Sequence, residues 1–135
     1  MNIKHRLQQY SRLNNQCNAL RERILTLRDR MYTLRSSADT SEIQANSGNT
    51  DKIGSSVALL ADLEEIYFND LNKLLKEQKE IEDMIKYLEP VEKLLIRSRY
   101  FDGETWESIC NIIGYSWAQT HRIHSRILVK LGNIQ

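Results

Sequence analysis

The chain has 135 residues, with 19 Lys and Arg against 18 Asp and Glu and a formal net charge of +1. A hydrophobic fraction of 41% beside 27% charged residues is ordinary for a folded protein and argues against global disorder. No run of about 18 apolar residues occurs, so no membrane span is expected, and the polar N-terminus does not resemble a secretory signal. Two isolated Cys predict neither a disulfide framework nor a metal site, and a cytoplasmic location is expected.

The net charge is a sum of unlike segments. Residues 1–36 carry eight basic and two acidic side chains, residues 37–92 carry five and thirteen, and residues 93–135 carry six and three. The chain therefore alternates between basic, acidic and basic segments. Such a pattern indicates that the segments pair with each other or with different partners.

Apolar residues recur at alternating steps of three and four between residues 10 and 34, and one heptad register fits all of them. This pattern predicts a long helix that pairs along an apolar seam. Arginines flank the seam, so a parallel homodimer would repel itself and an acidic partner helix is favoured. A solvated arginine face is the alternative. The a positions are Tyr10, Cys17, Ile24 and Met31, the d positions are Leu13, Leu20, Leu27 and Leu34, and the flanking arginines are Arg21, Arg23, Arg28, Arg30 and Arg35.

Residues 36–56 are rich in Ser, Thr, Asn, Asp and Gly, which predicts a polar loop. A helical apolar period then runs to residue 88, so we expect an antiparallel hairpin over residues 1–88, with helices at about 4–35 and 54–88. Pairs of arginine with acidic side chains at the rim are expected to select the partner helix, so that the arginines serve mainly helix pairing. The acidic residues are Glu64, Asp70, Glu77 and Glu82, and a second buried face is indicated by Leu59, Ile66, Phe68, Leu75 and Met84.

The sequence pattern of residues 89–135 predicts several short helices with capping residues. A helix, a glycine turn and a capped helix at this spacing are typical of a helix-turn-helix. The expected helix starts are Pro90, Thr105 and Ser116, and the glycines expected to end the helices are Gly103, Gly114 and Gly132. The expected core residues are Leu94, Leu95, Tyr100, Trp106, Ile109, Ile112, Ile113, Thr120, Ile123, Ile127 and Leu131.

The last helix is the candidate recognition helix, which would enter the major groove of DNA by its N-terminal end. This C-terminal segment is net positive, the sign that DNA binding requires. For Trp117, contact with DNA and contact with a protein both stay open, and His124 is expected to pack inside. Nearest the bases we expect Ser116, Trp117, Ala118, His121 and Arg122, with Ser125 also facing outward. Phosphate contacts are expected from Arg126 and Lys130, with Arg97 and Arg99 as further candidates.

The stretch RYFDGETWESI at residues 99–109, followed by GYS at 114–116 and HRIH at 121–124, resembles region four of sigma factors. The whole chain is similar to small phage and prophage proteins of Gram-positive bacteria, related in style to the ArpU and RinA late transcriptional regulators. This resemblance is specific over the C-terminal 45 residues and general over the first 90. It implies DNA binding through the recognition-helix residues between Ser116 and Arg126 and control of phage late genes. Thr120 departs from the Val that sigma-like domains usually hold there, but both are β-branched.

The sequence thus predicts an all-α, sequence-specific transcriptional regulator of phage type that binds double-stranded DNA. A homo-oligomer is expected, with a dimer favoured, and RNA polymerase is a candidate partner. No nucleophile–base pair, acidic pair or cofactor fingerprint indicates an enzyme, and no cofactor or metal is expected. Two alternatives stay open: a phage small terminase subunit that binds DNA for packaging, and an adaptor that contacts RNA polymerase without touching DNA.

Overall fold

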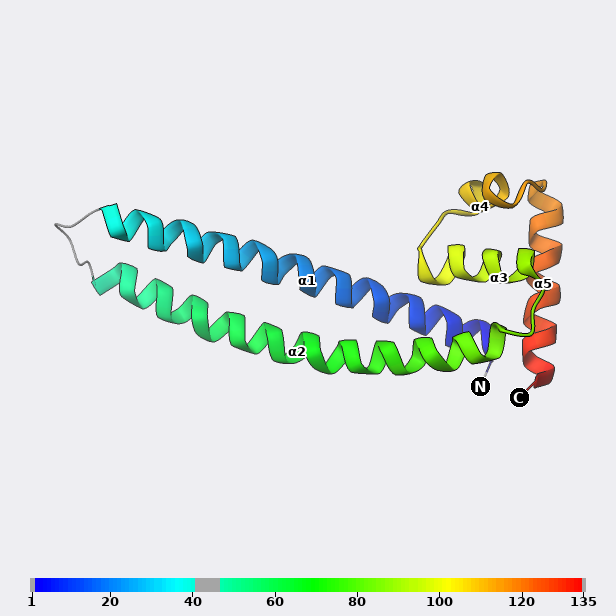
Figure 1. Cartoon of the computed structure of the whole chain (residues 1–135), viewed down its shortest axis with the longest axis horizontal. Coiled ribbons are helices and arrows are strands. Elements are labelled where there is room, and N and C mark those ends of the chain that lie inside the picture. Colours follow the sequence, from blue (N-terminus) through cyan, green and yellow to red (C-terminus); the bar gives the residue numbers. More distant parts are fainter. Residues whose placement is uncertain (1, 41–46, 135) are drawn as a thin grey trace. The chain divides into compact units, whose positions relative to one another are not determined.

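The computed structural model describes residues 2–40 and 47–134, and the side chains of residues 2–34 and 52–133. Every regular element in these ranges is helical, which confirms the expected all-α class. Two long helices, α1 (Ile3–Thr40) and α2 (Ser47–Ile85), come first (Figure 1). They are followed by α3 (Pro90–Ile96), a π-helical segment η1 (Arg97–Phe101), α4 (Trp106–Ile113) and α5 (Trp117–Ile134). None of the helices described has an apolar stretch of the length that a membrane crossing needs.

The chain forms two compact units. Unit 1 combines Met1–Asn15 with Lys73–Gln135, and unit 2 consists of Gln16–Asn72. Within each unit, α1 and α2 lie side by side and run in opposite directions (Figure 1). The ends of the two long helices therefore belong to the same compact unit as the short C-terminal helices.

Both long helices extend into the segment predicted as a polar loop over residues 36–56. α1 continues to Thr40 and α2 begins at Ser47, so the prediction is wrong at both ends, and residues 41–46 lie outside the described part. Ser, Thr and Asn each disfavour a helix by only about 0.7 kcal/mol or less, and a helix that has already formed extends readily. α2 also ends earlier than the predicted residue 88, because the chain turns after Ile85.

The seam of unit 2 is buried more deeply at the a positions of the heptads than at the d positions. Cys17, Ile24 and Met31 are buried together with Leu63 of α2, whereas the leucines at d are half-buried. One partner helix covers only one side of α1, so one row of the seam is enclosed and the other stays at the edge. Burial, with the charge of Asp70, raises the pKa of the Cys17 thiol, which therefore packs as a small apolar group.

Two arginines of α1 pair with described acids of α2. Arg28 Nη2 lies 2.7 Å from Glu64 Oε1, and Arg6 Nε lies 3.3 Å from Glu77 Oε2, with Nη2 on Glu80. Glu82 instead pairs at 2.7 Å with Arg97 of η1, and the other described arginines of α1 form no ion pair with a described residue. The prediction that the arginines serve mainly helix pairing is therefore wrong. Most of them flank the half-exposed d row at the edge of the helix pair, so their long side chains extend into solvent. The exposed arginines of unit 2 that form no ion pair with a described residue are Arg21, Arg23 and Arg30.

Caps and glycines set the limits of the short helices. The hydroxyl of Thr105 accepts a hydrogen bond from the backbone N–H three residues later at 3.1 Å, and that of Ser116 does the same at 3.2 Å. Gly103 and Gly114 adopt φ angles of +72° and +76°, which favour glycine and let the chain turn sharply. Gly132 does not end α5, which runs on to Ile134, because one glycine near a helix end weakens a helix by only about 1 kcal/mol.

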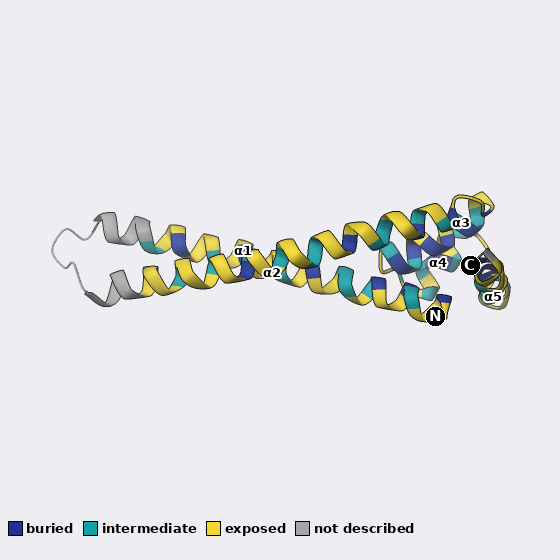
Figure 2. Ribbon diagram, turned by 90° about the horizontal axis from the view of Figure 1, so that it is seen from below, coloured by how far each residue is buried: buried dark blue, intermediate teal, exposed yellow. Residues whose placement is uncertain are grey.

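α3, α4 and α5 pack on one another around an apolar core (Figure 2). The face of α5 that was predicted to point inward is buried, as are Leu95, Tyr100 and Ile109. Leu94 and Ile112 are exposed, so their prediction as core residues is wrong, because a two-turn helix directs only part of its surface at its neighbours. Trp106 and Ile113 are half-buried. The buried residues of α5 are Thr120, Ile123, His124, Ile127 and Leu131.

The start of α1 and the end of α2 complete unit 1. Ile81 and Ile85 of α2 are fully buried, and the ring of Tyr10 on α1 lies 4.9 Å from that of Phe101. Asn14 Nδ2 donates a hydrogen bond to the Phe101 carbonyl at 2.9 Å. The π-helical turn is thus held from α1 by one ring contact and one hydrogen bond, which fixes the direction of the residues it carries.

The Thr120 hydroxyl gives a first prediction. Thr120 is fully buried and its Oγ1 has no hydrogen-bond partner among the described residues. Thr120→Val should therefore raise the free energy of unfolding by about 1 kcal/mol, because it removes an unsatisfied polar group without changing the shape. The matched control, Thr105→Val, should lower it by about 1 kcal/mol through loss of a helix cap. Urea unfolding measures both, and a destabilised Thr120→Val protein would show that the hydroxyl has a partner.

Candidate nucleic-acid interface

The outward face of α5 carries most of the residues predicted to contact DNA. A shallow hollow follows this face, and Trp117, at 55% exposure, lies at the N-terminal end of the helix. Ser116 is exposed and serves as the cap that begins the helix. Gln119 was not among the residues predicted to contact DNA, although its position about one turn before Arg122 places both on one side of the helix. The hollow is lined by Ala118, Gln119, His121, Arg122, Ser125 and Arg126.

The two arginines of this face differ in their surroundings, because the charge of Arg126 also acts on Glu92. Arg122 and Arg126 are exposed, and neither forms an ion pair with any side chain in the described ranges. Arg122 Nη1 reaches only Gln119 Oε1, at 3.4 Å. The guanidinium of an arginine without an ion pair presents several N–H donors in one plane, which match a phosphate group or the edge of a guanine base.

Two of the three other cations predicted to contact phosphate, Lys130 and Arg97, form ion pairs with carboxylates of the same unit. Lys130 Nζ lies 2.9 Å from both carboxylate oxygens of Glu92, and Arg97 pairs with Glu82. Burial raises the pKa of Glu92, but the hydrogen bonds from Lys130 and from the Glu89 N–H, with the charges of Lys130 and Arg126, outweigh it and hold this pKa below its usual value. Sequence spacing did not reveal these pairs, since the partners lie 38 and 15 residues apart.

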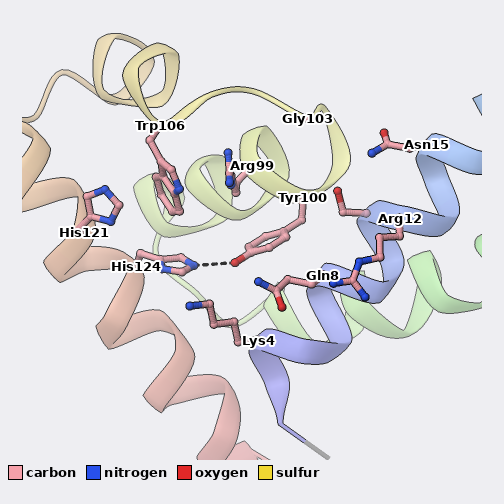
Figure 3. A pocket seen from close by; sticks show the side chains of 11 residues that line it. Lys4, Gln8, Arg12, Asn15, Arg99, Tyr100, Gly103, Trp106, His121 and His124 are labelled. Carbon is pink, nitrogen blue, oxygen red and sulfur yellow. Dashed lines mark hydrogen bonds between the residues drawn. The ribbon is translucent and has the colours of Figure 1, made fainter.

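Arg99, His121 and His124 belong to an aromatic cluster around Trp106 (Figure 3). The Trp106 ring lies 4.5 Å from the His121 ring and 4.8 Å from the His124 ring, and the Arg99 guanidinium stands over it at 4.7 Å. The Trp117 ring also lies near His121, at 4.6 Å. His121 is therefore half-buried in contact with two indoles rather than free on the surface, and Arg99 is held by a cation–π contact.

His124 is buried, as expected of a packing residue, and hydrogen bonds to Tyr100 at 2.8 Å between Nε2 and the hydroxyl. Its pKa is lowered to about 4, chiefly because burial disfavours the charged ring, and further by the positive charges of Lys4, His121 and Arg99. The ring is thus neutral at pH 7, and its Nε2 shares a hydrogen bond with the Tyr100 hydroxyl. Burial also raises the pKa of Tyr100.

In the parts of the chain that the structure describes, no group of three or more His, Cys, Asp or Glu is placed to hold a metal ion. Comparisons of the chain with family models, with characterised proteins and with solved structures gave no match.

The lowered pKa of His124 predicts a pH dependence of stability. Between pH 6.5 and about 4 the unfolded chain binds one more proton at this residue than the folded chain, so the free energy of unfolding falls as the pH is lowered through this window. We expect His124 to account for about 1 to 3 kcal/mol of the loss. Urea unfolding at pH 7 and pH 4.5 should show a smaller loss for His124→Gln than for the parent chain. His5→Gln, at an exposed position, is the control, and an equal loss in all three proteins would contradict the assignment.

Proposed function

We propose that this protein is a non-catalytic, sequence-specific DNA-binding regulator that uses α5 as its recognition helix. The observation that carries the proposal is the pair of exposed arginines, Arg122 and Arg126, on the face of α5 opposite its buried face. α4, the turn at Gly114 and the capped start of α5 follow one another as in a helix-turn-helix. The resemblance to sigma region four supports the same function and adds phage late-gene control as the proposed setting.

The contacts can be divided by chemistry. Arg122 lies near the N-terminal end of α5, where a helix in the major groove meets base edges, so it is the proposed base contact. Arg126 lies one turn further along and is the proposed phosphate contact. Trp117 and the polar side chains of the hollow complete the surface. Lys130 is not part of this proposal, because its charge is paired with Glu92.

Gel shifts with duplex DNA test the α5 surface. At low salt the parent chain should bind random duplex DNA, since phosphate attraction dominates such binding. Arg126→Gln should weaken binding to all sequences and lower the slope of log affinity against log salt by about 1. Arg122→Gln should cost about 1–3 kcal/mol on sites selected from a random library and relax their consensus.

The matched control is Arg21→Gln, which removes an exposed, unpaired arginine from α1 in unit 2. It should leave the affinity and the consensus unchanged. If the parent chain bound no DNA at low salt, the adaptor that contacts RNA polymerase without touching DNA would be favoured. If the α5 variants behaved like Arg21→Gln, DNA would be bound elsewhere.

We further propose that unit 2 self-associates through the side of the hairpin that leaves the d leucines half-buried. A groove on this side has Leu27, Leu59 and Leu63 in its walls, with Arg23 and Arg30 beside them. One side of the exposed surface of α2 offers apolar side chains together with acids that form no ion pair with a described residue, so α2 of a second copy matches the groove in polarity and in the charge of its arginines. The apolar side chains on this side are Leu59 and Ile66, which lie two turns apart, and the acids are Asp62 and Glu65.

Sedimentation equilibrium tests the dimer. The parent chain should have twice its monomer mass of 15.9 kDa. Ile66→Glu should shift the protein to monomer, because it puts a charge into the proposed apolar contact, whereas Tyr87→Glu, at a 74% exposed site in unit 1, should not. An assembly of eight or more copies would favour a small terminase subunit. A monomeric parent chain would exclude self-association.

A further inference from the structure

A pocket of about 530 Å³ opens in unit 1 between the start of α1 and the aromatic cluster (Figure 3). One wall is made by polar side chains of α1, and the other by residues of η1, α4 and α5. The proposed DNA surface on α5 shares only His121 with this pocket.

The α1 wall is basic. Lys4, Gln8 and Arg12 follow one another at intervals of four residues, so they lie on one face of the helix, and Figure 3 shows them beside the pocket. Lys4 and Arg12 are exposed and form no ion pair with any residue whose side chain is described. This face is separate from the buried apolar face of the helix at Ile3, Leu7 and Tyr10, so packing does not require its charge.

The opposite wall adds a third cation and an unused hydrogen-bonding atom. The Arg99 guanidinium is held against the Trp106 ring and by a 3.0 Å hydrogen bond from Nη1 to the Glu104 carbonyl, which leaves its charge without a counter-ion in the described part. His121 Nε2 is buried and has no hydrogen-bond partner there. A buried polar atom without a partner indicates that something outside this set of side chains satisfies it.

No carboxylate lines the pocket, although unit 1 as a whole contains several. Lys4 and Arg99, one on each wall, both add to the burial that lowers the pKa of His124, which agrees with two positive charges close to this ring. A concave site that collects like charges concentrates the potential and attracts counter-ions.

We propose that this pocket binds a phosphate-bearing anion, held between Lys4 and Arg12 on one wall and Arg99 on the other, with His121 Nε2 as an additional hydrogen-bonding group. Phosphate is favoured over a single carboxylate because cations on both walls match a group with several charged oxygens. The phosphate can come from a DNA backbone or from a free phosphorylated small molecule. The site itself does not depend on DNA binding by α5.

Calorimetric titration of the full chain with inorganic pyrophosphate at low salt tests the pocket. The parent chain should show saturable binding with one site per chain. Arg12→Gln should weaken it by about tenfold, the loss expected from one charge-assisted contact. Lys4→Gln should weaken it likewise, and both replace exposed residues on the helix surface, so folding is retained.

The matched control is Arg21→Gln, which removes another exposed arginine of α1 that forms no ion pair with a described residue and lies outside both the pocket and the groove. Its affinity should equal that of the parent chain. Absence of saturable binding, or equal affinity in the Arg12 and Arg21 variants, would overturn the proposal. If only the pocket variants lose binding, duplex DNA of random sequence is added to the parent chain saturated with pyrophosphate. Release of pyrophosphate then identifies DNA phosphate as the source, and its retention identifies a free phosphorylated molecule.

Discussion

Burial of one face of α5 is the constraint on which the rest of unit 1 depends. Ile127 and Leu131 are fully enclosed, and each buried aliphatic side chain of this size contributes about 1.5–3 kcal/mol. This packing fixes the rotation of α5 about its own axis, so Arg122 and Arg126 face outward. It also directs His124 into the core, where its hydrogen bond to Tyr100 joins α5 to the π-helical turn.

The ion pairs of the structure show that the basic first segment and the acidic second segment neutralise each other only in part. A basic first segment and an acidic second one would neutralise each other if all their side chains met, but Arg28 and Glu64 form the one pair seen in unit 2 among its described side chains. Most of the arginine charge of α1 therefore stays on the surface. At Arg12 it lines the pocket proposed to bind an anion, and further along α1 it borders the groove proposed for a second copy.

The half-buried leucines connect the hairpin to the proposed function. A single pair of helices encloses one row of side chains in unit 2 and leaves the second at the edge, where a further helix would bury it. In the proposed function, the two arginines of α5 that form no ion pair with a described residue give one copy only a modest attraction to DNA. A dimer doubles the number of such contacts and links two recognition helices, so self-association and DNA binding support each other in this proposal.

The sequence by itself determined the helical class, the caps at Thr105 and Ser116, the turns at Gly103 and Gly114, and the inward face of α5. These depend on local chemistry and on the helical period, which neighbouring residues carry. Tertiary structure decided the pairing of Lys130 with Glu92, the cluster of Arg99 and His121 around Trp106, and the pocket between α1 and that cluster. These arise between residues far apart in the chain, where side-chain reach and competing partners, rather than spacing, select the contact. For the same reason the start of α1 could be recognised as a helix from its pattern but not as a wall of this pocket.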